Sequence, residues 1–201
     1  MDKKLISIKV KQGIETRKKL IKVATDIFSN EGFEKASMEE IVIIARVTRG
    51  ALYHHFENKL ALFESVFDNV QAQISDHILT AANKEPDKWD QLVAGCKAFL
   101  EACIDPKIQR IAIIDAPSVL GLNTWRKVDS SHGQFLLTSC LNELIKDGII
   151  RKQPVDALAH ILSGAINEAA LWIAQSKNPK KSLKEAMEVI ETLLNSLIYK
   201  K

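Results

Sequence analysis

The chain has 201 residues, of which 46% are hydrophobic, 26% charged and 6% aromatic. This balance is typical of a folded globular protein and excludes collagen-like, mucin-like and disordered chains. No apolar run approaches the roughly 18 residues that cross a bilayer. The lysine-rich N-terminus also lacks the apolar core of a secretory signal. We therefore expect a protein of the cytoplasm that does not span a membrane.

Charge is unevenly distributed along the chain. Residues 1–59 hold 12 Lys or Arg against 8 Asp or Glu, and the first 22 residues alone hold 8 against 2. Residues 60–201 are nearly neutral, with 16 basic and 17 acidic side chains. A basic N-terminal third suggests a polyanionic partner for that third, although a solvated lysine-rich terminus would give the same pattern.

Apolar residues recur at helical spacing along almost the whole chain, which predicts an all-α fold. In the first helix Leu20, Ala24 and Phe28 form one stripe, and Gly32 follows where a C-terminal cap belongs. We expect an N-terminal domain of three short helices over residues 1–58 and a larger helical domain over 59–201. About nine helices are predicted, near residues 15–30, 38–44, 49–55, 59–82, 88–104, 107–115, 123–147, 155–176 and 181–199.

The segment SMEEIVIIARVTRGALYHHFENK, residues 37–59, has the pattern of a helix-turn-helix. Ser37 followed by Glu40 fits a capping box, and Thr48 is a natural N-cap for a second short helix. Leu52 and Phe56 are expected to point into a core shared with the first helix.

The outward face of that second helix suggests contact with DNA. Gly50 and Ala51 have almost no side chain, so the backbone can approach a flat surface closely, as in the major groove. Arg49 is suited to paired hydrogen bonds with guanine. A generic helical hairpin with an exposed Tyr-His surface is the alternative. The candidate DNA-binding residues are Ser37, Arg46, Thr48, Arg49, Gly50, Ala51, Tyr53, His54, His55 and Lys59.

Residues 16–66 resemble the DNA-binding domain of the tetracycline-repressor (TetR) family of bacterial transcription regulators. The segments FSNEGFEKASMEEI, VTRGALYHHF and ENKLALFESV carry the resemblance. One departure is Arg46, which stands in the turn where many members have glycine. A weaker likeness continues through DAPSVLGLNTWRKVDSSHG and INEAALWIA to the ligand domains of one subgroup.

The resemblance implies a homodimer that places one recognition helix of each subunit in a major groove of a palindromic operator. It also implies dimerisation through the last two helices, packed as a four-helix bundle. The same faces would otherwise be internal core. The expected interface residues are Gly164, Leu183, Met187, Ile190, Leu194 and Leu197.

The middle helices are expected to form a mostly apolar small-molecule pocket with a few polar groups. Asn167 and Glu168 stand out, because polar groups within an apolar helix need partners. Each candidate could equally be plain core. The candidate lining residues are Phe67, Phe99, Trp125, His132, Phe135, Leu136, Asn167, Glu168, Leu171 and Trp172.

No cofactor or metal site is predicted, because the histidines show no ligand spacing and no CxxC occurs. Cys96, Cys103 and Cys140 are expected to be buried reduced thiols, with a thiol sensor as the alternative. We expect a repressor that an unknown small molecule releases by tilting the helix at 59–82. Three other interpretations remain open, namely an enzyme, a ligand-binding protein without an operator, and an activator.

Overall fold

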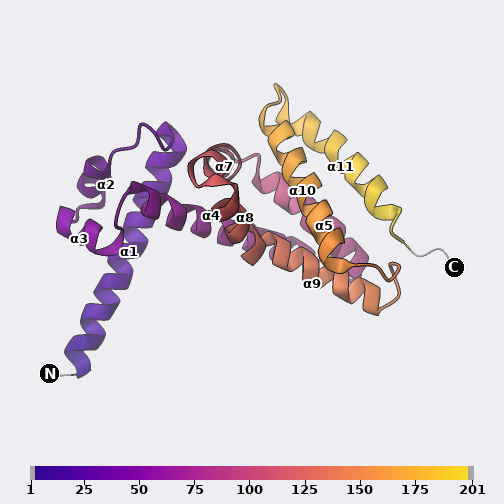
Figure 1. Ribbon diagram of the computed structural model, residues 1–201, viewed down its shortest axis with the longest axis horizontal. Coiled ribbons are helices and arrows are strands. Elements are labelled where there is room, and N and C mark those ends of the chain that lie inside the picture. The colour runs from indigo at the N-terminus through magenta and orange to yellow at the C-terminus, as the bar shows by residue number, and fades with distance from the viewer. Residues whose placement is uncertain (1–2, 199–201) are drawn as a thin grey trace.

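The computed structural model describes the backbone of residues 3–198. Within that range the chain is helical, apart from connecting loops and one isolated antiparallel bridge between Ile150 and Ile198. Figure 1 shows two lobes, with α1 to α3 in one lobe, the later helices in the other, and α4 running between them. The predicted all-α class is confirmed.

The N-terminal lobe consists of α1 (Lys3–Glu31), α2 (Met38–Ala45) and α3 (Arg49–His55). These helices bury Phe28, Ile41 and Leu52 against one another without any solvent exposure. Gly32 closes α1 with a φ of +83°, and its N–H donates to the Phe28 carbonyl across 2.9 Å, as predicted for a C-terminal cap. Because α1 begins at Lys3, this helix is longer than the expected 15–30.

Helix α4 (Lys59–Ala82) belongs to both lobes, and its predicted bounds are confirmed. The Asn58 side chain caps its start by accepting from the Ala61 N–H across 2.9 Å. Phe63 packs edge-on against Phe28 of α1, with ring centroids 5.1 Å apart, whereas the later turns pack on α5. A tilt of α4 would therefore be felt in both lobes.

The C-terminal lobe differs from the prediction in two places. The expected single helix at 123–147 is wrong, since His132 has φ −119° and ψ −100°, which interrupts the helix before Gly133. The helix expected at 107–115 is instead a short α-helix followed by a π-helix, and the next short helix, at 116–119, was not predicted. The other predicted helices are present with shifted ends. The elements are α5 (Lys88–Ala102), α6 (Pro106–Ile108), the π-helix η1 (Gln109–Asp115), α7 (Ala116–Val119), α8 (Gly121–Ser131), α9 (Gly133–Lys146), α10 (Val155–Ala174) and α11 (Pro179–Asn195).

A polar junction joins η1 to the end of α1. Arg110 Nε lies 3.0 Å from one carboxylate oxygen of Asp115, and the other oxygen accepts from the Phe33 N–H across 3.1 Å. Lys107 forms a second link to Asp26 of α1 across 2.6 Å. Short π-helices often occur at functional sites. This one ties the C-terminal lobe directly to the N-terminal lobe, independently of α4.

Helix α10 is, among the described residues, the one helix long and apolar enough to cross a membrane by length and composition alone. It is slightly shorter than the predicted helix at 155–176, but it is more apolar than the sequence analysis expected of any segment. Asn167 and Glu168 interrupt its apolar character, and the helix packs on α9 and α11 of its own lobe. A single helix of this kind is weak support for a membrane span.

Candidate DNA-binding surface and effector cavity

The turn between α2 and α3 holds α3 by backbone and capping hydrogen bonds. Arg46 adopts the left-handed conformation, with φ 50° and ψ 49°, and its N–H donates to the Ile43 carbonyl across 3.1 Å. The Thr48 hydroxyl then caps α3 by accepting from the Ala51 N–H across 3.1 Å, as the sequence predicted. Left-handed arginine is uncommon, so glycine at this position would relieve a small strain.

The exposed face of α3 presents Arg49, Gly50, Tyr53 and His54 to solvent. The Arg49 guanidinium lies 5.6 Å from the centre of the Tyr53 ring, and 3.7 Å separate it from the carboxylate of Glu39 on α2. Both members of this ion pair are highly exposed, so it is weak and its charges are free to exchange partners. A Cβ added at Gly50 would meet only the Thr48 hydroxyl, at 4.0 Å.

Other candidate residues surround this face. The Ser37 hydroxyl caps α2 by accepting from the Glu40 N–H across 3.4 Å, which satisfies half of the predicted capping box. His55 is half-buried against α1, and burial, together with the nearby His54 and Arg17, lowers its pKa. His55 therefore supports the packing of α3 on α1, whereas His54 stays on the exposed face.

The side chain of Lys59 makes its contacts within the N-terminal lobe. Its ammonium group donates to the carbonyls of Glu34 and Ala36, across 3.1 and 3.2 Å, and lies 4.6 Å from the centre of the Phe33 ring. A lysine engaged in this way holds the loop between α1 and α2 against the start of α4. The ammonium group is thus engaged within the fold of the free protein, and a DNA contact by Lys59 stays a prediction.

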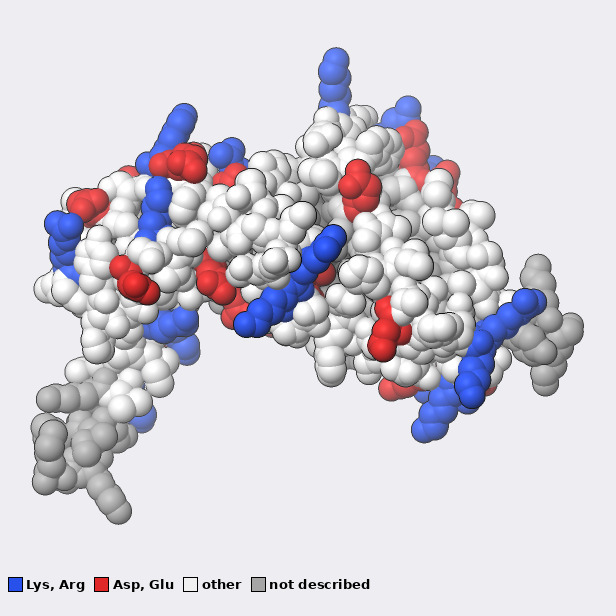
Figure 2. All heavy atoms as spheres, viewed as in Figure 1, with Lys and Arg blue, Asp and Glu red and all other residues white. Residues whose placement is uncertain are grey.

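Charged side chains are mixed on the visible face of the molecule. Figure 2 shows basic and acidic groups interspersed over the N-terminal lobe. No single-sign patch therefore marks a DNA-binding surface on this face, and the shape and chemistry of α3 are the better guide.

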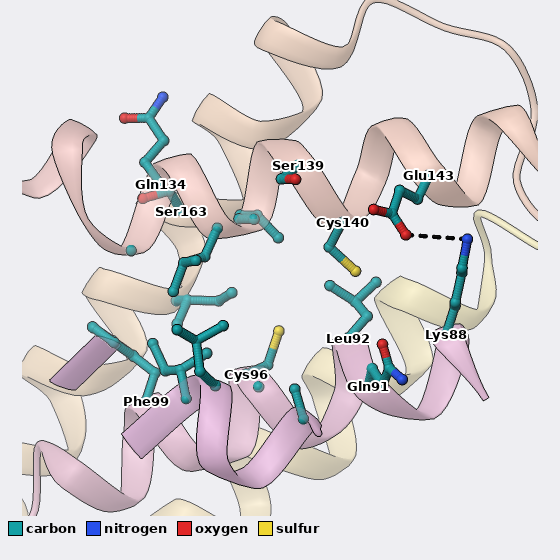
Figure 3. Close-up of a pocket in the computed structure, with 18 of the residues that line it drawn as sticks. Lys88, Gln91, Leu92, Cys96, Phe99, Gln134, Ser139, Cys140, Glu143 and Ser163 are labelled. Atoms are coloured by element: carbon teal, nitrogen blue, oxygen red, sulfur yellow. Dashed lines mark ion pairs between the residues drawn. The ribbon is translucent and has the colours of Figure 1, made fainter. Parts of the chain in front are cut away.

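A cavity of about 230 Å³ lies in the C-terminal lobe between α4, α5, α9 and α10. Figure 3 shows the thiols of Cys96 and Cys140 turned into it, with Leu92 and Phe99 on its apolar wall. At one end, Lys88 pairs with Glu143 across 3.1 Å. A second cavity of about 310 Å³ lies beside it, lined by α8 and α10. Both are lined mainly by apolar groups, as small-molecule sites are.

Comparison with known proteins decides the family. Residues 20–66 match the family model described as bacterial regulatory proteins, tetR family, and residues 89–197 match the model described as tetracyclin repressor-like, C-terminal domain. The chain belongs to the TetR family of bacterial transcription regulators. It is therefore a DNA-binding regulator of the helix-turn-helix class, which is not a class of enzymes.

Individual relatives resemble most of the chain or about half of it. A solved TetR-family regulator from Pectobacterium atrosepticum is 31% identical, with a TM-score of 0.81 over 94% of this chain and 97% of that one. The transposon Tn10 TetC protein of Escherichia coli is 26% identical over 85% of this chain and 82% of its own length. The regulator TtgR of Pseudomonas putida is 34% identical over 48% of this chain and 47% of its own.

The structure of this TetR-family chain brings some of the predicted pocket residues together. Phe99, Leu136 and Asn167 line the first cavity. The second is lined by Trp125, Asn167, Glu168 and Leu171.

Four predicted pocket residues line neither cavity. Phe67 is fully buried in the core, whereas Phe135 and Trp172 are exposed. His132 Nε2 lies 2.9 Å from the Asp68 carboxylate and so links the break between α8 and α9 to α4. These positions correct that part of the prediction, because aromatic residues at helical spacing also serve core and surface roles.

Sequence reasoning missed several groups that line the cavities. They include a buried carboxylate, Asp129, which is only 6% exposed, and the thiols of Cys96 and Cys140. Burial raises the pKa of the Cys96 thiol to about 12 and that of Cys140 to about 11. Both thiols are therefore protonated near neutral pH, which disfavours the alternative of a reactive thiol sensor.

The predicted dimer residues lie mostly inside one chain. Met187, Ile190 and Leu194 on α11 are buried in the core of the lobe, so a second chain cannot reach them. Leu183 and Leu197 are half-buried, and Gly164 on α10 is exposed. The predicted interface residues on α11 thus contribute mainly to the core of one chain, and the face through which a dimer would form stays a prediction.

Proposed function

We propose that this regulator represses transcription as a homodimer that binds a palindromic operator and is released by a small molecule. The observation that carries the proposal is the exposed N-terminal half of α3, where Arg49 and Tyr53 flank the side-chain-free Gly50. This surface allows the backbone to approach base edges while the neighbouring side chains reach bases and phosphates.

Each residue of this surface has a defined task in the proposal. Arg49 leaves Glu39 and donates two hydrogen bonds to guanine. Thr48, Tyr53 and His54 contact phosphates, aided by Ser37 and Arg46 at the adjacent turn and helix start. Ala51 and Gly50 keep the helix close to the groove floor.

The exposed apolar residues of α10 and α11 support a dimer. Ile161 and Trp172 on α10, with Val189 and Leu193 on α11, are 48–68% exposed. Contiguous exposed apolar faces of this kind mark protein interfaces. Gly164 lies on the same side of α10, next to the exposed Ala165, and permits close helix approach. The two helices and their copies would form a four-helix bundle.

Two paths can carry a signal from the cavities to α3. Helix α4 lines the first cavity and also packs on α1, and η1 contacts the end of α1 through Asp115 and Phe33. A ligand that favours a different spacing of the two α3 helices weakens operator binding by its preference between the two states, typically 1–3 kcal/mol. Half-sites one turn apart require about 34 Å between the recognition helices.

The test is footprinting with the purified protein on DNA upstream of its own gene. We expect a protected palindrome and a loss of preference at one base pair of each half-site in Arg49→Ala, at a cost of roughly 1–3 kcal/mol there. A uniform loss across sequences would show that Arg49 contacts only the backbone. The absence of any protected site would refute operator binding. If the protein increased the expression of a reporter gene placed behind the protected site, it would be an activator.

A further inference from the structure

The two cavities meet at a polar cluster inside the C-terminal lobe. Asp129, Gln134, Ser163 and Asn167 line both cavities, whereas most of the remaining wall of the first cavity is apolar. A molecule that extends through both cavities would therefore pass this cluster, two members of which, Gln134 and Ser163, are labelled in Figure 3. Polar groups at the centre of an apolar site usually decide which ligands it accepts.

Asp129 carries the only acidic side chain of this cluster, and it is buried. The amide of Gln71 donates to its carboxylate across 3.5 Å, and the side chains of Asn167 and Ser163 also hydrogen-bond to it. These partners are neutral, and His132, which lies nearby, is paired with Asp68. Among the described side chains of residues 10–198, no lysine or arginine lies within ion-pair distance of Asp129.

The other charged groups around the cavities do not balance this carboxylate. Lys88, at the far end of the first cavity, is held by Glu143 and Asp147, across 3.1 and 2.7 Å. Arg126 and Glu168 line the second cavity with opposite charges, and both are solvent-exposed. The imbalance at the meeting point is therefore negative.

A buried carboxylate without a cation is costly, and the structure shows the consequence. Burial raises the pKa of Asp129, although its three neutral hydrogen-bond partners oppose the rise. A cation placed beside it would remove the penalty by pairing with the charged form.

We propose that the effector is an organic cation, with an apolar body in the first cavity and a protonated amine that pairs with Asp129. This inference rests on the proposed effector role of the cavities. Asn167 and Ser163 would position the carboxylate. The apolar wall that includes Phe99 of α5 and Leu136 of α9 would hold the body of the molecule.

The experiment compares three probes that share a naphthyl group and differ in charge. They are the amine 2-(1-naphthyl)ethylamine, the alcohol 2-(1-naphthyl)ethanol and the carboxylate 1-naphthaleneacetate. Binding to the full chain is measured by calorimetry near neutral pH. We expect the amine to bind at least about tenfold more tightly than the alcohol, and the acetate to bind most weakly. In Asp129→Asn the amine should lose at least about tenfold in affinity, and the alcohol less than about threefold.

Glu185→Gln is the control, because Glu185 is an exposed carboxylate on α11 that lines neither cavity. It should change each affinity by less than about threefold. Equal affinities for amine and alcohol, equal losses in Asp129→Asn, or no binding of any probe at about 1 mM would each overturn the inference. The three-probe comparison in the unchanged protein decides the matter even if Asp129→Asn does not fold.

Operator binding is measured separately without any probe. Absence of operator binding would refute the proposed function and leave the recognition of cations by Asp129 to the calorimetry. Intact operator binding without a preference for the amine would refute this inference alone.

Discussion

At the scale of single residues, the proposed DNA binding favours glycine at position 50, whereas the fold does not require it. A methyl group at this position would point into open space in the free protein, since only the Thr48 hydroxyl lies within 4.0 Å. Alanine is also favoured over glycine within helices, by up to about 1 kcal/mol. Folding alone therefore gives no reason for glycine here.

We predict that Gly50→Ala keeps or raises the melting temperature but weakens operator binding by about tenfold or more. The methyl group would hold the backbone of α3 away from the bases, and each tenfold loss corresponds to about 1.4 kcal/mol. Operator titrations and thermal melts measure the two effects. Gly133→Ala, where an added Cβ also meets open space, should leave operator affinity unchanged. Unaltered operator affinity in Gly50→Ala would argue against close backbone approach.

Lys59 yields the opposite pattern, because its ammonium group is engaged within the fold. Lys59→Ala should lower the free energy of unfolding by about 1–3 kcal/mol, through the loss of two charge-assisted hydrogen bonds and the contact with Phe33. The dependence of operator affinity on salt should stay unchanged, since no phosphate contact is lost. Lys35→Ala, at an exposed neighbouring residue, is the control for stability. A weaker dependence of operator affinity on salt in Lys59→Ala would show that Lys59 does contact a phosphate.

At the scale of elements, local chemistry made the N-terminal lobe predictable. N-terminal caps mark the starts of two helices, with Thr48 before α3 and Asn58 before α4, and the bounds predicted for both helices match the structure. The break between α8 and α9 was not predicted, because apolar residues at helical spacing lie on both sides of it, with Trp125 and Val128 before it and Leu136 after it. At the break, His132 pairs with Asp68, which is distant in sequence.

The face of a helix that meets a partner is equally hidden from the sequence. The stripe of Leu183, Met187, Ile190 and Leu194 on α11 is apolar whether it faces the core or a second chain. The structure shows that it faces the core, and that Val189 and Leu193 remain exposed beside it. The full lining of the cavities could not be predicted for a related reason, since residues from α4, α5, α8, α9 and α10 meet only in three dimensions.

The junction between α1 and η1 gives a prediction at this scale. Gly32 has a φ of +83°, and a Cβ there would overlap the Arg110 guanidinium, with 2.9 Å to its Cζ. Gly32→Ala should therefore lower the free energy of unfolding by roughly 1–2 kcal/mol for the backbone alone, and displace Arg110 from Asp115. Thermal melts measure the loss, against Gly133→Ala as the control with open space around the added Cβ. If the two variants have the same melting temperature, alanine adopts the φ of Gly32 without measurable strain.

At the scale of the whole molecule, the apolar residues exposed on α10 and α11 support the proposed dimer. A single chain leaves Ile161 and Leu193 68% and 52% exposed, on adjacent helices of the lobe opposite α3. A dimer through this face would leave both α3 surfaces free to contact one DNA duplex. The proposed assembly would also cover apolar side chains that the fold of one chain leaves exposed.

Leu193→Glu should convert this dimer into monomers without unfolding them. A carboxylate buried at the interface would face its copy across the two-fold axis or lie unpaired in an apolar contact, and either arrangement is strongly unfavourable. Because Leu193 is exposed within one chain, the helical content and the monomer fold should persist. Sedimentation equilibrium at micromolar concentration measures the change, and circular dichroism verifies folding. Ile43→Glu, at a residue 73% exposed on α2, introduces the same charge far from the interface and should remain dimeric. If Leu193→Glu sediments as a folded dimer, the interface lies on another face of the molecule.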